Sequence, residues 1–275
     1  MATKSTLRKL IDRLIDDDCS GMAAETAYSF IFSFFPLLLL AASSASFFGH
    51  GEHTVESVST ALSRFMPAES HDLIQSYVNS LFASGPRSGL FSISLLLLLW
   101  TGSSLISTLM KSVNRAYHIP PDRLRPYWKE KLVAIVLVPI TFLPIVLASI
   151  AAIIGSRAAA FVGTEIGFDI EASDLWALTE WALIVLVLFV IISLLYYVSP
   201  CKKLRIKEVL PGAILASVLW AIITVGFNYY VGRFGSYNRI YGSIGAFIVL
   251  LLWMYLTSLA FIIGGEFNAV LEENP

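Results

Sequence analysis

Long apolar runs separated by short polar connections dominate this chain. The last two runs, about residues 209–232 and 241–268, each exceed the roughly 20 residues that a helix needs to cross ~30 Å of hydrocarbon. A short Gly/Tyr/Asn/Arg turn separates them, which predicts a membrane-spanning helical hairpin. Runs of similar character cover about residues 22–48, 89–117, 132–155 and 175–198. We therefore expect an all-α, polytopic membrane protein with six transmembrane helices, a domain that occupies residues 21–275.

Polar residues recur at helical spacing within four of these spans, which places them on one face of each helix. Polar groups are costly in hydrocarbon unless they face protein or water, so these faces should point inward. They predict a partly polar cavity between spans one, two, five and six. Spans three and four are nearly pure Ile/Val/Leu/Ala, and we expect them outside this group, facing lipid. The candidate cavity residues are Glu25, Ser29, Ser33, Ser103, Ser107, Asn114, Ser217, Thr224, Asn228, Tyr255, Ser258 and Glu266.

These candidates also have structural interpretations. The Ser, Thr and Asn side chains could make hydrogen bonds between helices instead of contacting a substrate. Glu25 and Glu266 lie near the predicted inner interface, where a carboxylate can reach the headgroups or form a structural ion pair. If instead either carboxyl is functional, its protonation is a candidate for coupling that function to a source of energy.

Two further segments are amphipathic. Residues 1–20 carry apolar positions at helical spacing between charged ones, which predicts an N-terminal interfacial helix and not a cleavable signal. Asp18 or Ser20 is positioned to cap the helix that follows. Residues 49–88 predict short amphipathic helices on the outer side, and residues 156–174 a short outer loop.

Composition agrees with a membrane protein: apolar residues make up 56% of the chain and charged residues 14%, against roughly a quarter charged in a soluble domain. Of the 19 Lys and Arg residues, 14 lie in the N-terminal segment and in the second and fourth connections. The positive-inside rule then places both termini in the cytoplasm. Arg115, Arg123 and Arg125 would attract an anionic headgroup at the cytoplasmic entrance.

Enzyme chemistry finds little support in the sequence. All four histidines lie in predicted loops, and there is no GxSxG elbow or phosphate-binding Gly loop. A metal site from His50, Glu52, His53 and His71 lacks a supporting spacing such as HExxH. No basic domain predicts nucleic-acid binding, and we expect neither a cofactor nor a bound metal. The turn residues Tyr237, Asn238 and Arg239 either close the last hairpin or bind a phosphate or sugar.

Several motifs resemble those of the YihY/BrkB family of bacterial inner-membrane proteins. They are AAETAYSFIFSFFPLLLL, SVNRAYHIP, VLPGAILASVLW and YNRIYGSIGAFIVLLLWMYLTSLAFIIGGEFNAV, and together they cover nearly the whole chain in the family's order. The resemblance implies six spans in the bacterial inner (plasma) membrane. Family members have carried the label ribonuclease BN, and branches are linked to serum resistance and to export of lipid A precursors.

The resemblance and the polar faces together lead to a function hypothesis. The protein moves or exports an amphipathic molecule, an anionic lipid or a lipid-linked compound, with the headgroup in the polar cavity and the tails in lipid. The alternative is a non-transporting scaffold that docks an envelope complex through outer residues 52–83. A ribonuclease is a distant third.

Overall fold

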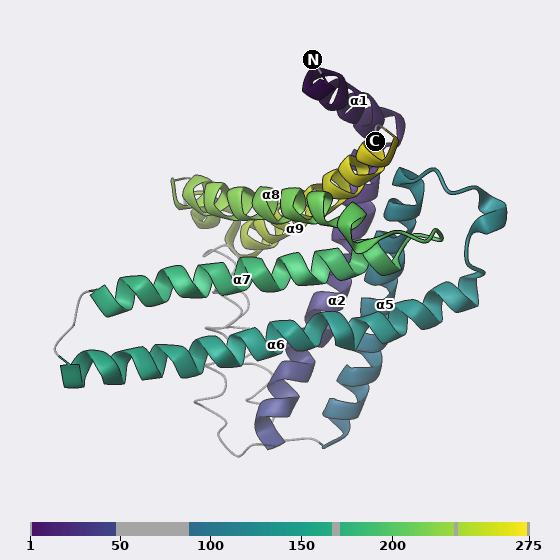
Figure 1. Ribbon diagram of the computed structural model, residues 1–275. Coiled ribbons are helices and arrows are strands. Elements are labelled where there is room, and N and C mark those ends of the chain that lie inside the picture. The colour runs from purple at the N-terminus through teal and green to yellow at the C-terminus, as the bar shows by residue number, and fades with distance from the viewer. Residues whose placement is uncertain (1, 48–87, 167–170, 234–235, 274–275) are drawn as a thin grey trace.

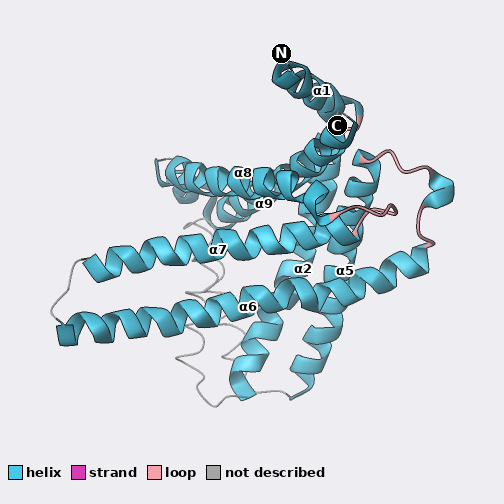
Figure 2. Ribbon diagram, viewed as in Figure 1, coloured by secondary structure: helices cyan, strands magenta, loops and turns pink. Residues whose placement is uncertain are grey.

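A computed structural model describes residues 2–47, 88–166, 171–233 and 236–273. Apart from Ser88, the predicted outer amphipathic segment lies outside these residues, as does the hypothetical site of His50, Glu52, His53 and His71. The described part of the chain is helical except for its connections, as Figure 2 shows. The all-α prediction is therefore confirmed.

Seven α-helices and one short 3-10 helix form the described residues. The predicted N-terminal helix is present as α1, and a turn at residues 17–18 leads directly into the first predicted span. The elements are α1 (Ala2–Asp16), α2 (Cys19–Phe47), α5 (Ser88–Ala116), η1 (Pro121–Arg123), α6 (Tyr127–Ile166), α7 (Glu171–Val198), α8 (Ile206–Arg233) and α9 (Ser236–Glu273).

Within the residues that the structure describes, five helices are long and apolar enough to cross a membrane. Their candidate spans are Cys19–Leu40, Gly89–Ala116, Trp181–Val198, Ile206–Tyr230 and Gly245–Glu273. The predicted third span falls in α6, which is not among the five. The structure describes only part of the α6 side chains, so the sixth span stays a prediction. A polytopic membrane protein accounts for the five.

Two predicted connections are largely helical in the structure. The outer loop expected at residues 156–174 is wrong, because α6 continues to Ile166 and α7 begins at Glu171. The expected turn at Tyr237, Asn238 and Arg239 is wrong as well, because α9 already begins at Ser236. In both places the helix continues past the apolar run, since the polar residues beyond it still satisfy their backbone groups within the helix.

The six long helices contact one another in a closed ring, in the order α2, α5, α6, α7, α8, α9 and back to α2, with a further contact between α5 and α9. Figure 1 shows α6 and α7 side by side, crossing the pair α2 and α5. The helices predicted to surround a cavity, α2, α5, α8 and α9, are thus neighbours within this ring.

The expectation that spans three and four lie wholly outside is wrong for one half of each helix. Leu137 and Val138 of α6, and Leu195 and Tyr196 of α7, are buried in the same core cluster as residues of the other four long helices. Figure 1 shows the opposite ends of α6 and α7 projecting away from α2 and α5. Uniformly apolar sequence does not distinguish burial against protein from exposure to lipid, which explains the error.

Glycines bring α8 and α9 into close contact. A Cβ added to Gly264 would lie 2.5 Å from the Gly212 carbonyl oxygen and 2.8 Å from the Ala216 Cβ. Beside this crossing, the buried Asn268 side chain accepts a hydrogen bond from the Gly212 N–H (2.6 Å) and donates to the Val209 carbonyl (3.0 Å). This crossing fixes the α9 segment that carries Glu266.

Candidate functional site

Glu266 lies in the candidate span of α9, and its side chain is fully buried. Its Oε2 atom lies 3.9 Å from Nη1 of Arg13, and it has no hydrogen-bond donor. Its Oε1 atom lies 3.8 Å from the thiol Sγ of Cys19, which acts as a weak donor. A buried carboxylate with one distant cation and one weak donor is under-satisfied, a costly arrangement that marks functional positions in membrane helices.

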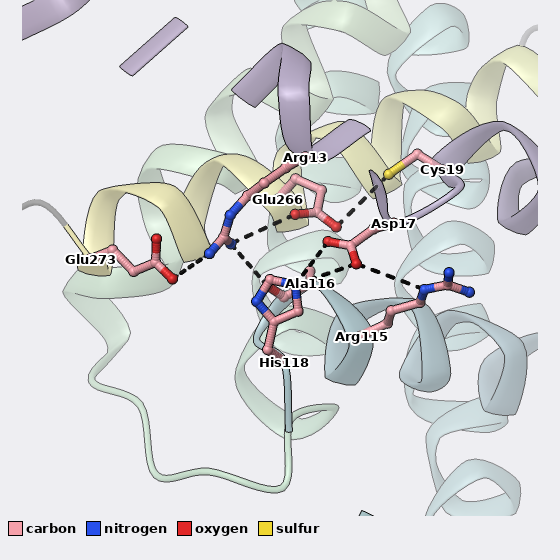
Figure 3. Close-up of polar contacts among 8 residues, drawn as sticks. All are labelled: Arg13, Asp17, Cys19, Arg115, Ala116, His118, Glu266 and Glu273. Atoms are coloured by element: carbon pink, nitrogen blue, oxygen red, sulfur yellow. Dashed lines mark hydrogen bonds and ion pairs between the residues drawn. The ribbon is translucent and has the colours of Figure 1, made fainter. Parts of the chain in front are cut away.

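Arg13 belongs to the last turn of α1 and joins that helix to the bundle, as Figure 3 shows. Besides Glu266, its guanidinium pairs with Glu273 of α9 and donates from Nη1 to the Ala116 carbonyl at 3.1 Å. The donation to Ala116 also satisfies one of the last carbonyls of α5. Arg13 therefore holds the ends of α1, α5 and α9 together.

Asp17 lies in the turn between α1 and α2, with its side chain only 10% exposed. Its Oδ2 atom lies 3.2 Å from Nε2 of His118, and its Oδ1 atom lies 3.9 Å from Nε of Arg115. The next residue, Asp18, adopts a left-handed backbone (φ 50°) and caps α2, because its Oδ1 accepts a hydrogen bond from the Gly21 N–H at 3.2 Å. The prediction that Asp18 or Ser20 caps this helix is confirmed for Asp18.

His118 terminates α5 in a Schellman motif. Its own N–H bonds to the Arg115 carbonyl (2.8 Å), and the Ile119 N–H bonds to the Asn114 carbonyl (3.0 Å). The motif requires a left-handed residue, usually glycine, and His118 takes this conformation with φ 46°. His118 and Asp18 are the two non-glycine residues with positive φ among those described, and both flank Asp17.

We call Arg13, Asp17, Cys19, Arg115, His118, Glu266 and Glu273 the polar end cluster. Four helix ends meet in it, from α1, α2, α5 and α9 (Figure 3). Its two guanidiniums are held by three carboxylates, and an anion of a ligand could compete with those carboxylates for either guanidinium. Chemically, the cluster can therefore exchange ion-pair partners or take up a proton.

The cluster unites only two of the residues that the sequence singled out, Glu266 and Arg115. Glu25 is exposed and does not share a site with Glu266. Asn114 is buried, but its amide faces the α7–α8 connection: its Oδ1 accepts from the Cys201 N–H at 2.8 Å, and its Nδ2 lies 3.4 Å from the Ser199 carbonyl. Arg125 binds the same connection through the carbonyls of residues 198–200.

Most serines of the polar faces are buried but bond to their own helices. Ser33, Ser103, Ser217 and Ser258 each donate to a carbonyl three or four residues earlier. Ser107 is buried, and its hydroxyl has no hydrogen-bond partner. Apart from Ser107, these hydroxyls need no ligand to satisfy their donors.

Other candidates contact a neighbouring helix or lack a described contact. Ser29 lies 3.4 Å from Thr108, Tyr255 lies 3.0 Å from Ser20, and Trp253 donates to Thr224 at 3.4 Å. Asn228 is partly buried, with an unpaired Oδ1 atom. The side chains of Tyr237, Asn238 and Arg239 lie outside the described part of the structure.

Sequence reasoning missed the other five residues of the cluster, and the most central of these are Arg13 and Asp17. Both belong to a charged, amphipathic N-terminal segment, where charges ordinarily face water. The available signal was Arg13 itself, which shares an α1 face with the buried Leu10 through i, i+3 spacing.

Comparison with known proteins gives the chain a family. The YfkH protein of Bacillus subtilis (strain 168), named as ribonuclease-like, is 30% identical over 98% of this chain and 99% of its own length. A UPF0761 membrane protein of Xanthomonas campestris pv. campestris (strain B100) is 28% identical over 96% of this chain, which spans 60% of that relative. No solved structure matches. The family described as Virulence factor BrkB matches residues 10–275, almost the whole described bundle, and the chain belongs to this family.

Proposed function

We propose that this protein moves an amphipathic, anionic lipid or lipid-linked molecule, such as a lipid A precursor, across or out of the bacterial inner membrane. Membership of the BrkB family and five candidate spans make it an integral membrane protein. We further propose that α6 is the sixth span and that both termini face the cytoplasm. In this orientation the polar end cluster lies at the cytoplasmic end of the bundle. The protein acts without enzyme chemistry.

The buried, under-satisfied Glu266 is the observation that carries this proposal. Burying an ion pair costs roughly several kcal/mol of desolvation free energy per ion. If the contact were purely structural, apolar side chains of similar volume could take its place without this cost. Its cation comes from α1, which lies outside the candidate spans. The pair therefore joins a peripheral helix to the end of a membrane helix.

An anionic headgroup would act on this pair directly. A phosphate binds a guanidinium with two parallel hydrogen bonds, and it would replace Glu273 and Glu266 as the partner of Arg13. Release of Arg13 loosens the contacts of α1 with α5 and α9 and opens the end of the bundle to the headgroup. Glu266 then either takes up a proton or attracts another cation, because an unpaired buried carboxylate is strongly disfavoured.

The test is translocation of fluorescent anionic lipids in proteoliposomes, with wild type, Glu266→Gln and Glu25→Gln. Glu25 is a matched control, since it is an exposed glutamate on a neighbouring helix. Glutamine keeps the shape of Glu266 but weakens its hold on Arg13. We expect at least a ten-fold change in rate for Glu266→Gln and less than a two-fold change for Glu25→Gln, because breaking a buried charge pair by removing one partner costs about 3–5 kcal/mol. If folded wild-type protein moves no lipid, the transport proposal is wrong and the scaffold hypothesis gains weight.

A further inference from the structure

Aromatic rings and ammonium groups meet where α6 begins beside α5, away from the polar end cluster. The Lys131 Nζ atom lies 5.3 Å from the centre of the Trp100 ring, and the Lys129 Nζ atom lies 5.2 Å from that of Trp128. Both rings are exposed, Trp100 by 68% and Trp128 by 60%. We call Trp100, Ser104, Trp128, Lys129 and Lys131 the α5–α6 face.

The ammonium group of Lys131 is fixed in place but not neutralised. It donates to the Ser104 hydroxyl at 2.9 Å and lies against the Trp100 ring. Within the described part of the chain, no carboxylate lies within ion-pair distance of it. A hydroxyl and a ring hold the position of a cation, yet neither supplies the negative charge that a partly desolvated ammonium requires.

Neighbouring charges add to this imbalance. Lys131 precedes the predicted third span, and burial together with the positive charge of Lys111 lowers its pKa. Glu130 acts in the opposite direction. Lys111, Lys129 and Lys131 against the single carboxylate of Glu130 leave an excess of positive charge here, which favours an anion.

The surroundings indicate what carries that anion. Trp100 and Ser104 belong to the candidate span of α5, where the nearby residues Leu96 and Leu97 are exposed and apolar. Leu132 and Val136, which follow Lys131 in α6, are also exposed and apolar. Exposed apolar side chains on a membrane helix face acyl chains, and tryptophan favours the boundary between acyl chains and headgroups. A ligand that matches both parts has a negative headgroup and apolar tails.

We propose that the α5–α6 face binds an anionic phospholipid of the surrounding bilayer, with the lipid phosphate on Lys131 and the glycerol and upper acyl chains against Trp100. Lys129 and Lys111 attract the same headgroup from farther away. This inference goes beyond the transport proposal, because it concerns a resting binding site and holds whether or not the protein moves lipid.

Tryptophan quenching by brominated lipids tests the site in bilayer nanodiscs. Each disc contains phosphatidylcholine and phosphatidylglycerol at a fixed ratio, with the bromine on the acyl chains of one lipid or the other. The contribution of Trp100 is the difference between the wild type and Trp100→Phe. The lysine variants are Lys131→Gln, Lys131→Arg and, as a matched control, Lys203→Gln, which removes an exposed lysine from another basic connection.

In wild type, brominated phosphatidylglycerol should quench Trp100 as if enriched about five-fold over phosphatidylcholine. Lys131→Gln should abolish the enrichment, while Lys131→Arg and Lys203→Gln should keep it. High salt should reduce it, because screening weakens an exposed charge pair. Equal quenching of wild type by the two lipids would overturn the proposal, as would enrichment that survives in Lys131→Gln. Loss of enrichment when inorganic phosphate replaces chloride at constant ionic strength would also overturn it, since the face would then bind a soluble anion and not a lipid.

Discussion

The close crossing of α8 and α9 makes Gly264 a sensitive position in the bundle. In Gly264→Ala, the new Cβ would lie 2.5 Å from the Gly212 carbonyl oxygen and 2.5 Å from the Tyr196 hydroxyl. Backbone cannot yield as a flexible side chain can, so the two helices must move apart. Tyr196 is fully buried and donates its hydroxyl proton to the Phe261 carbonyl, so it has little freedom to withdraw.

The expected magnitude follows from these contacts. Overpacking costs about 1–3 kcal/mol, and disturbance of the buried Tyr196 hydrogen bond adds about 0.5–1.5 kcal/mol. Alanine is a better helix former than glycine by about 1 kcal/mol, which offsets part of this loss. The net destabilisation is about 0.5–3.5 kcal/mol, which corresponds to a fall of roughly 1–14 °C in the unfolding temperature.

Thermal unfolding in detergent, followed by circular dichroism, measures the change. Gly226→Ala is the matched control, because a Cβ at Gly226 in α8 meets nothing within 4 Å. It should raise the unfolding temperature slightly through helix propensity. Removing the Tyr196 hydroxyl in the Gly264→Ala background should return part of the lost stability, although Tyr196→Phe alone destabilises. If Gly264→Ala unfolds at the same temperature as Gly226→Ala, the close crossing is refuted.

Two further predictions concern the polar end cluster and the cysteines. His118→Gly should unfold at or above the wild-type temperature. His118→Val should be less stable than His118→Gly by about 1–2 kcal/mol, because a β-branched residue is strained at φ 46°. Equal unfolding temperatures for the two variants would contradict the Schellman cap. A charged maleimide should label the partly exposed Cys201 and leave the buried Cys19 unmodified until the protein unfolds. With our proposed orientation, labelling of Cys201 occurs in inverted vesicles and not in intact spheroplasts; the reverse pattern would contradict cytoplasmic termini.

Hydropathy predicted the helices well because a membrane span must satisfy its backbone internally and present apolar side chains to lipid. Helical spacing also correctly placed Ser33, Ser103, Ser217 and Glu266 on buried faces. It could not predict their partners, because a serine that bonds to its own helix has the same spacing as one that faces a cavity. For this reason the buried serines are weaker evidence of a cavity than the sequence alone indicated.

Charges at the ends of spans were harder to place. Glu25 and Glu266 have similar sequence surroundings, yet Glu25 is exposed and Glu266 is buried against Arg13. The difference depends on where α1 packs, which is a tertiary contact between residues far apart in sequence. The hydrogen bond between Asn114 and the α7–α8 connection could not be predicted for the same reason, since Cys201 lies 87 residues away in sequence.

The contacts of Arg125 have a consequence for the order in which the chain assembles during synthesis. Its guanidinium binds the carbonyls of Val198, Ser199 and Pro200, the nearest of them 73 residues farther along the chain. At about 5–20 residues per second, a ribosome makes those partners roughly 4–15 s after Arg125. During this interval α6 is synthesised without the Arg125 hydrogen bonds that join the residues before α6 to the end of α7. Closing the ring of helices is consequently a late event of biogenesis, which must wait until the α7–α8 connection has left the ribosome.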